Sequence, residues 1–172
     1  MEIGNNKILT IANKKEEQFL RKKTEEFDFS KWKRADIAEL IKKMHRMMRE
    51  ANGIGLSANQ IGLPYQFFVA EVPGDNGLKF YSIFNPKIEK VSKEKAKEEE
   101  GCLSIPGVYG DVDRPERIVI SGQDKNKRPL KIKAWGLLAR VFQHEIDHLN
   151  GILFIDKAKK LYEIHRGASS AI

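Results

Sequence analysis

The chain has 172 residues, of which 41% are hydrophobic and 32% charged, and it carries a formal net charge of +7. This length is typical of one domain that buries about two thirds of its unfolded surface, so we expect a single domain over 1–172 with a short C-terminal tail from about residue 157. No apolar run approaches the roughly 20 residues of a membrane span, and residues 1–15 lack the apolar core of a signal peptide. We therefore expect a cytoplasmic protein with no membrane partner.

The cysteine content and the positive charge each leave more than one interpretation. The single cysteine, Cys102, excludes an internal disulfide and leaves a buried structural thiol, a reactive thiol or a metal ligand. The residue type alone favours the structural thiol. The charge would suit an anionic partner such as RNA, but the lysines are spread along the chain near many glutamates, as on solvated faces. We expect no DNA partner.

The first clear element is an amphipathic helix over residues 31–51, with Ser30 as its N-cap and Gly53 as its stop. His45 falls just off the apolar stripe of this helix, so we expect an exposed residue and not a metal ligand. The apolar side chains that recur at helical spacing are Ile37, Leu40, Ile41, Met44, Met47 and Met48.

A glycine-rich stretch over residues 52–62 follows this helix. Because it follows a helix and not a strand, it is a poor dinucleotide-binding fingerprint. Its most informative residue is Gln60, whose side-chain amide could donate to an oxyanion or could simply cap local backbone.

The middle of the chain predicts strands. Residues 66–72 and 79–84 have strand character, and 117–123 and 130–134 form a probable hairpin around a turn at 124–129. The lysine and glutamate run at 87–100 is interpreted as a solvated strand pair or loop, and 153–155 as one more short strand.

A second helix is predicted from about Trp135 to the stop at Asn150-Gly151. It places four residues on one face that should point to the interior: Leu137, Val141, His144 and His148. The order of elements predicts an α+β fold in which mostly antiparallel sheets surround this helix.

The second helix carries an H-E-x-x-H motif, His144-Glu145-Ile146-Asp147-His148. Two imidazoles four residues apart project from one helix face and suit a metal, while the neighbouring glutamate can carry a proton. A catalytic site of this kind typically takes a third protein ligand. The candidates are Glu163 and His165 downstream, and Cys102 upstream in the compact stretch 100–107.

Three stretches together resemble the peptide deformylase family. They are Gly53-Ile54-Gly55-Leu56-Ser57-Ala58-Asn59-Gln60, Glu100-Gly101-Cys102-Leu103-Ser104 and Gln143-His144-Glu145-Ile146-Asp147-His148. The resemblance extends from about Ile8 to Asp156. The chain departs from the family pattern at Ser57, where alanine is common, and at Ala12-Asn13, where Pro-Asp is usual.

The resemblance implies a metal-dependent hydrolase that removes the formyl group from the N-terminal formylmethionine of newly synthesised polypeptides and releases formate. It implies that Cys102, His144 and His148 hold one divalent metal, with Fe(II) expected and Zn, Ni or Co as possible substitutes. Glu145 would transfer the proton. The Gln60 amide and the Leu103 backbone N–H would stabilise the oxyanion.

Substrate selection is expected to depend on an apolar pocket for the methionine side chain, formed by Ile54, Leu137 and Val141. The peptide backbone is expected to pair with extended chain around Gly55 and Gly107, as in β-augmentation. Asp147 points elsewhere on the helix, and we expect it to form a salt bridge with Arg114 that fixes the helix.

Two other functions compete with this one. A zinc endopeptidase shares the H-E-x-x-H motif, although few residues after His148 remain to supply a third ligand. A nonenzymatic RNA- or ribosome-binding module would use the net charge and the basic segment 157–160, but no aromatic-interleaved basic motif is present. A third alternative is an enzyme whose basic surface lets it associate transiently with the ribosome.

Overall fold

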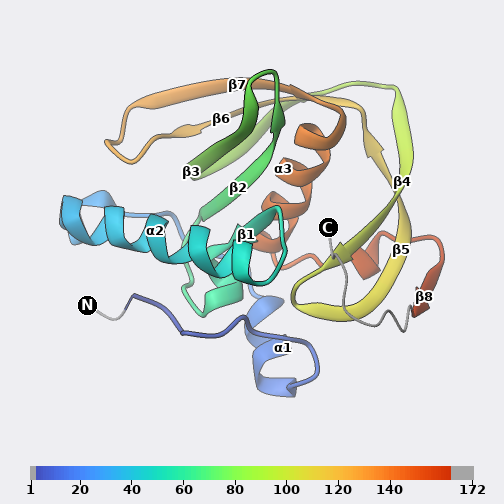
Figure 1. The fold of residues 1–172 in the computed structure, drawn as a ribbon, viewed down its shortest axis with the longest axis horizontal. Helices are drawn as coiled ribbons and strands as arrows, with labels where there is room; N and C mark the ends of the chain where they lie inside the picture. The colour runs from blue at the N-terminus through green and yellow to red at the C-terminus, as the bar shows by residue number, and fades with distance from the viewer. Residues whose placement is uncertain (1–2, 164–172) are drawn as a thin grey trace.

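The computed structural model describes residues 3–163, which form two antiparallel sheets and three α-helices (Figure 1). The helices are α1 (Lys14–Leu20), α2 (Arg34–Glu50) and α3 (Gly136–Leu149). The five-stranded sheet has the order β1 (Gly55–Ser57), β2 (Phe67–Gly74), β3 (Gly77–Val91), β6 (Arg117–Gln123) and β7 (Pro129–Trp135), and the three-stranded sheet has β4 (Lys95–Cys102), β5 (Ile105–Pro115) and β8 (Leu161–Glu163). The predicted α+β class with mostly antiparallel sheet is confirmed.

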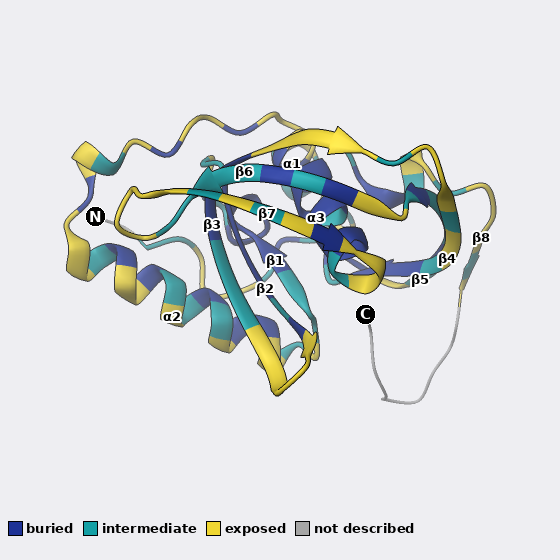
Figure 2. Ribbon diagram, turned by 90° about the horizontal axis from the view of Figure 1, so that it is seen from above, coloured by how far each residue is buried: buried dark blue, intermediate teal, exposed yellow. Residues whose placement is uncertain are grey.

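Helix α3 lies between the two sheets, where Figure 1 shows it near the centre of the molecule. It contacts β1, β2 and β7 of the larger sheet and β5 of the smaller one. Figure 2 shows α3 largely buried, whereas α2 has an exposed outer face. A helix enclosed in this way has apolar or paired side chains on nearly every face, and ten of its fourteen residues are buried.

Helix α2 covers the larger sheet through the predicted apolar stripe, with Leu40, Met44 and Met48 fully buried against β1 and β2. Its predicted start is wrong: Asp28 accepts from the Ser30 amide and caps a short 3-10 helix (Phe29–Lys31), so α2 begins only at Arg34. The prediction that His45 is exposed is also wrong. Its Nε2 lies 2.6 Å from Glu71 Oε1, and its ring contacts Phe80.

The lysine and glutamate run at 87–100 forms strands, but they do not pair with each other. Residues 87–91 belong to β3 and pair with β6, while residues 95–102 form β4 and pair with β5. The predicted strand at 153–155 is a 3-10 helix (Phe154–Asp156), because the Asp156 carboxylate accepts from the Leu153 amide and closes a turn. No helix was predicted at α1 and no strand at β8, and β1 and β5 were expected only as extended chain around Gly55 and Gly107.

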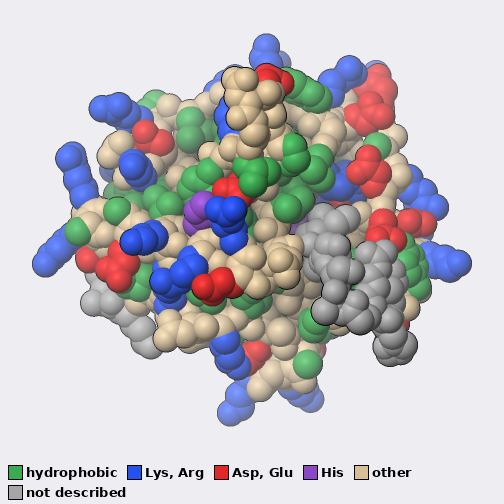
Figure 3. Space-filling model, viewed as in Figure 1, with side chains coloured by type: hydrophobic (Ala, Val, Ile, Leu, Met, Phe, Trp, Pro, Cys, Tyr) green, Lys and Arg blue, Asp and Glu red, His purple; other side chains and the backbone are tan. Residues whose placement is uncertain are grey.

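Charged side chains are distributed over the surface. Figure 3 shows Lys and Arg spread across one face, with Asp and Glu among them. Several form exposed ion pairs, such as Arg117 with Glu94 at 3.0 Å and Lys97 with Asp111 at 2.9 Å. Between residues 3 and 163, no helix has the length and apolar character needed to cross a bilayer.

Candidate metal centre and substrate pocket

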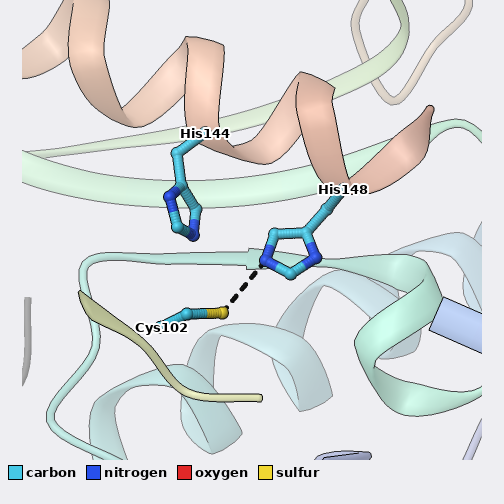
Figure 4. A group of neighbouring side chains, drawn as sticks. All are labelled: Cys102, His144 and His148. Atoms are coloured by element: carbon cyan, nitrogen blue, oxygen red, sulfur yellow. Dashed lines mark hydrogen bonds between the residues drawn. The ribbon is translucent and has the colours of Figure 1, made fainter. Parts of the chain in front are cut away.

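Cys102, His144 and His148 come together between α3 and the end of β4. One ligand atom from each lies within 4.8 Å of the others. Figure 4 shows both imidazoles projecting from α3 toward the cysteine. The Cys102 Sγ atom lies 3.1 Å from His148 Nε2. The upstream candidate, and not Glu163, therefore joins the two histidines: Glu163 pairs with Val108 at the edge of the smaller sheet, and His165 lies outside the described residues.

The turn between β4 and β5 positions the cysteine. Cys102 pairs with Ile105 across a two-residue turn, which directs the thiol toward α3. The Ser104 amide donates to Cys102 Sγ at 3.4 Å, and Gln60 Nε2 lies 3.8 Å from the same sulfur. Both contacts involve the sulfur atom that would bind a metal, for which cysteine must be in its thiolate form.

A buried ionic network fixes the first histidine. Glu100 accepts two hydrogen bonds from Arg114, at 2.5 and 2.9 Å, and one from Arg140 at 2.6 Å. Its Oε2 also lies 3.1 Å from His144 Nδ1. Burial opposes ionisation of Glu100, but the bonds from His144 and Arg114 outweigh burial and hold its pKa well below the usual range.

The expected salt bridge between Arg114 and Asp147 is present at 2.7 Å. Arg114 thus links Glu100 on β4 to Asp147 on α3. Lys157 also contacts Asp147 at 2.7 Å. The network anchors α3 between the sheets.

The donor set fits a divalent transition metal. A thiolate and two imidazoles are soft to intermediate ligands, as such ions prefer. Burial tends to lower the pKa of His144, but the Cys102 sulfur and the Glu100 carboxylate raise it to about 10. Burial keeps the pKa of His148 well below its ordinary value. Among residues 3–163, no hydrogen-bond partner is found for the buried His148 Nδ1.

Glu145 is enclosed beside this cluster. It is 3% exposed, and burial raises its pKa to about 6. Ser57 Oγ lies 2.5 Å from Glu145 Oε2. A side chain on Gly55 would collide with the other carboxylate oxygen, so a glycine at this position is what makes room for the glutamate.

The contacts of Gln60 agree with both interpretations of its side chain, as a cap of local backbone and as a donor to an oxyanion. Its Oε1 accepts from the Ser57 backbone amide at 2.8 Å, which is the local capping role. Its Nε2 donates to Ser104 Oγ at 3.0 Å and faces the cysteine. The contacts of Ser57, Asn59 and Ser104 were missed because nothing in a single sequence shows which short polar side chains in a loop reach another element.

An open pocket adjoins the cluster and contains most of the predicted substrate residues. Leu137 was expected to face the interior but is 40% exposed, because the first turn of α3 forms the rim of the pocket. Gly107 does not line this pocket; it lies in a neighbouring hollow with Leu103, which borders both. The pocket is lined by Ile54, Gly55, Gln60, Glu100, Gly101, Cys102, Leu103, Leu137, Arg140, Val141, His144 and Glu145.

Comparison with known proteins gives one consistent result. Residues 6–163 match the family model for polypeptide deformylase. Peptide deformylase 2 of Gloeobacter violaceus is 42% identical over 125 residues, which cover 72% of this chain and 67% of that protein. For the first four curated relatives, the match spans 61–67% of each relative's length.

Solved structures agree in fold. A peptide deformylase from Synechococcus elongatus in complex with actinonin has a TM-score of 0.78 at 38% identity, covering 89% of this chain and 78% of that one. A Met-Ala-Ser bound peptide deformylase from Acinetobacter baumannii has a TM-score of 0.79 at 27% identity, covering 87% and 96%. The chain belongs to the peptide deformylase family.

Proposed function

We propose that this chain is a cytoplasmic, metal-dependent hydrolase that removes the formyl group from the N-terminal formylmethionine of newly synthesised polypeptides and releases formate. The observation that carries the proposal is a buried Cys/His/His cluster next to a buried glutamate at the base of an apolar pocket. Family members are metal-dependent hydrolases of formylated peptides, and the Acinetobacter relative binds Met-Ala-Ser, the sequence that deformylation of formyl-Met-Ala-Ser leaves. We treat residues 1–172 as one catalytic domain.

Cys102, His144 and His148 would hold the metal. When bound, a divalent ion supplies Lewis acidity and lowers the pKa of water, so that a nucleophile is available near neutral pH. The ion we expect is Fe(II), with Zn, Ni or Co as substitutes. Glu100 contributes by fixing the His144 ring through Nδ1, which leaves Nε2 directed at the cluster.

Glu145 would accept a proton from the attacking water and deliver it to the departing amine. Its raised pKa, about 6, suits both steps, because a group that titrates near working pH can take and return a proton. The tight enclosure by Ser57 and Gly55 keeps the carboxylate in one orientation.

The developing negative charge on the formyl oxygen would be met by two N–H donors. Because Gln60 Oε1 is occupied by the Ser57 amide, the Gln60 Nε2 group must face the cysteine and the pocket. The Leu103 backbone N–H is the second donor, and among residues 3–163 no hydrogen-bond acceptor is found for it. Donors held in place before reaction stabilise an oxyanion without reorganisation.

The substrate would enter along the pocket. Ile54, Leu137 and Val141 supply apolar surface for the methionine side chain. The extended backbone at Gly55 would pair with the peptide. Because Gly107 lies in the adjoining hollow beyond Leu103, we assign it to residues that follow the methionine.

Two assays test this function. Formate release from formyl-Met-Ala-Ser, with no cleavage of internal peptide bonds, is the expected result; the reverse pattern would favour an endopeptidase. Metal analysis of anaerobically purified protein should find Fe(II), and air exposure should lower activity by oxidising the iron or Cys102. Equal specific activity before and after exposure would contradict Fe(II).

Transient contact with the ribosome is a separate proposal, based on the net charge. The C-terminal basic segment is a weak candidate for it, because Lys157 pairs with Asp147 and Lys159 pairs with Asp113. Co-sedimentation with ribosomes, compared before and after replacement of Lys157, Lys159 and Lys160 by glutamate, tests this contact. Sedimentation that the replacements leave unchanged would remove the role of the segment.

A further inference from the structure

Two buried polar atoms lack hydrogen-bond partners within the described residues, and they lie on side chains of residues that already touch. They are Asn59 Oδ1 and His148 Nδ1. Asn59 Nδ2 donates to the His148 carbonyl at 2.6 Å, and both residues are 1% exposed. Leaving two such atoms unpaired in a buried site is unfavourable, and native proteins rarely do so.

The Asn59 amide has a defined orientation. Its Nδ2 group faces two backbone carbonyls, those of His148 at 2.6 Å and Leu20 at 3.5 Å. Turning the amide over would place its oxygen against these carbonyls, which cannot donate. Oδ1 is therefore a buried acceptor available to a donor.

His148 can supply that donor. Its Nε2 faces Cys102, so this nitrogen is in position to bind the metal (Figure 4). An imidazole that binds metal through Nε2 carries its hydrogen on Nδ1, and ligating histidines almost always donate this hydrogen to a neighbouring oxygen. His144 has such a neighbour in Glu100, at 3.1 Å.

We propose that Asn59 is the orienting partner of His148: in the metal-loaded protein, Asn59 Oδ1 accepts the His148 Nδ1 hydrogen, directly or through one buried water, while Asn59 Nδ2 holds the His148 backbone. The inference rests on the proposed metal site. Asn59 would be a positioning residue, and the two histidines would be held by different chemistry, one by a carboxylate and the other by a neutral amide.

Metal binding tests this assignment without reference to turnover. Metal-free full-length protein is titrated with Co(II), and the thiolate-to-cobalt absorption is followed in competition with a chelator. Asn59→Ala should weaken Co(II) binding by about 10- to 100-fold. Asn59→Asp keeps an acceptor for Nδ1 but sets its second oxygen against the His148 and Leu20 carbonyls, so it should lose clearly less affinity than Asn59→Ala.

The matched control is Asn150→Ala. Asn150 also donates its side-chain amide to an α3 carbonyl, but to that of Ile146, at 2.9 Å, and not to that of His148. This variant should bind Co(II) like the wild type. Wild-type affinity in Asn59→Ala overturns the inference, and so does an equal loss in Asn59→Ala and Asn59→Asp, because the Nδ2 bond alone would then explain the effect.

A second measurement remains available if Asn59→Ala does not fold. In Zn(II)-loaded wild type, the His148 Nδ1 hydrogen should give a slowly exchanging signal in ¹⁵N-edited NMR, and it should move downfield in Asn59→Asp, where the acceptor is charged. An unchanged position of this signal overturns the inference.

The Co(II) titration separates failure of the metal site from failure of the inference. If the wild type binds Co(II) without thiolate absorption, the metal site and the inference both fail. If the wild type shows this absorption and the variants bind equally well, only the inference is overturned.

Discussion

The Ser57 hydroxyl lies 2.5 Å from Glu145 Oε2 and 3.0 Å from the Glu145 carbonyl, and both residues are buried. A hydroxyl has one hydrogen, and an ionised carboxylate is the stronger acceptor. The bond therefore favours the charged form of Glu145, against burial, which raises the pKa of this carboxyl to about 6. A residue that departs from the common family pattern thus touches the proposed proton carrier.

Replacing Ser57 by alanine should shift the acidic limb of the pH profile. Loss of the donor leaves the Glu145 carboxylate less stabilised, so its pKa rises further and less of it is ionised at a given pH. We expect the acidic limb of kcat/KM for formate release to move to higher pH by about one pH unit. Activity well above that limb should change little.

Ser121→Ala is a matched control for this change. Ser121 makes the same kind of bond, at 2.5 Å to Glu89, but on the exposed surface. Its replacement should leave the pH profile unchanged. A profile for Ser57→Ala that overlays the wild type would show that the hydroxyl donates to the carbonyl and not to the carboxylate.

Replacing Glu145 by glutamine should separate catalysis from metal binding. The amide is close in size and can still contact Ser57, but it cannot accept a proton from water. Because Glu145 is not a member of the Cys/His/His cluster, the variant should keep its metal. We expect formate release to fall by about 10²- to 10⁴-fold, the usual contribution of a positioned acid–base group.

Metal content and single-turnover formate release check this expectation, and the exposed Glu89→Gln serves as the control. Cys102→Ala, by contrast, should lose metal and activity together. Retention of most of the turnover by Glu145→Gln would rule out the proposed proton transfer.

The metal-free site should bind ions more tightly as the pH rises. The Cys102 sulfur and Glu100 outweigh burial and raise the pKa of His144 to about 10, so at pH 7 the ring carries a proton that a metal must displace. Below pH 10, affinity for Zn(II) should therefore increase by about tenfold per pH unit for this proton alone. Calorimetry at pH 7 in buffers of different ionisation enthalpy should detect the released proton. Binding without proton release would contradict a charged His144.

The elements whose bounds were predicted best are those with a clear pattern of side chains in the sequence. The predicted helix from Trp135 to Asn150 matches α3 closely, and the proposed hairpin matches β6 and β7. Cys102 could be preferred to the other candidate ligands only through the family resemblance, since its residue type alone favoured a structural thiol. The distance between Cys102 and the H-E-x-x-H motif in sequence gives no geometric reason to join them.

The contacts that Asn59 and Ser57 make with α3 could not be predicted from the sequence, for a physical reason. Asn59 and Ser57 lie 89 and 88 residues from their partners on α3, and such pairs depend on how β1 and the 3-10 helix after it (Ala58–Ile61) pack against α3. Strand β5, which was not predicted, contains two glycines, two prolines and three charged residues, so its alternation is weak. A turn between Cys102 and Ile105 joins β5 to β4. The sequence does not show that this turn directs Cys102 toward the histidines.

Replacing Arg114 by methionine should destabilise the fold strongly, since this guanidinium joins Glu100 and Asp147 at a site that is 3% exposed. Removing one partner leaves buried charge without compensation, which costs about 3–5 kcal/mol. We expect the lower end of this range, because Arg140 still contacts Glu100 and Lys157 still contacts Asp147. Urea unfolding of metal-free protein measures the change without the added stabilisation of a bound ion. The control Arg117→Met removes an exposed ion pair with Glu94 and should lower the free energy of unfolding by less than about 1 kcal/mol. Equal losses in the two variants would mean that the buried network contributes no more than a surface ion pair.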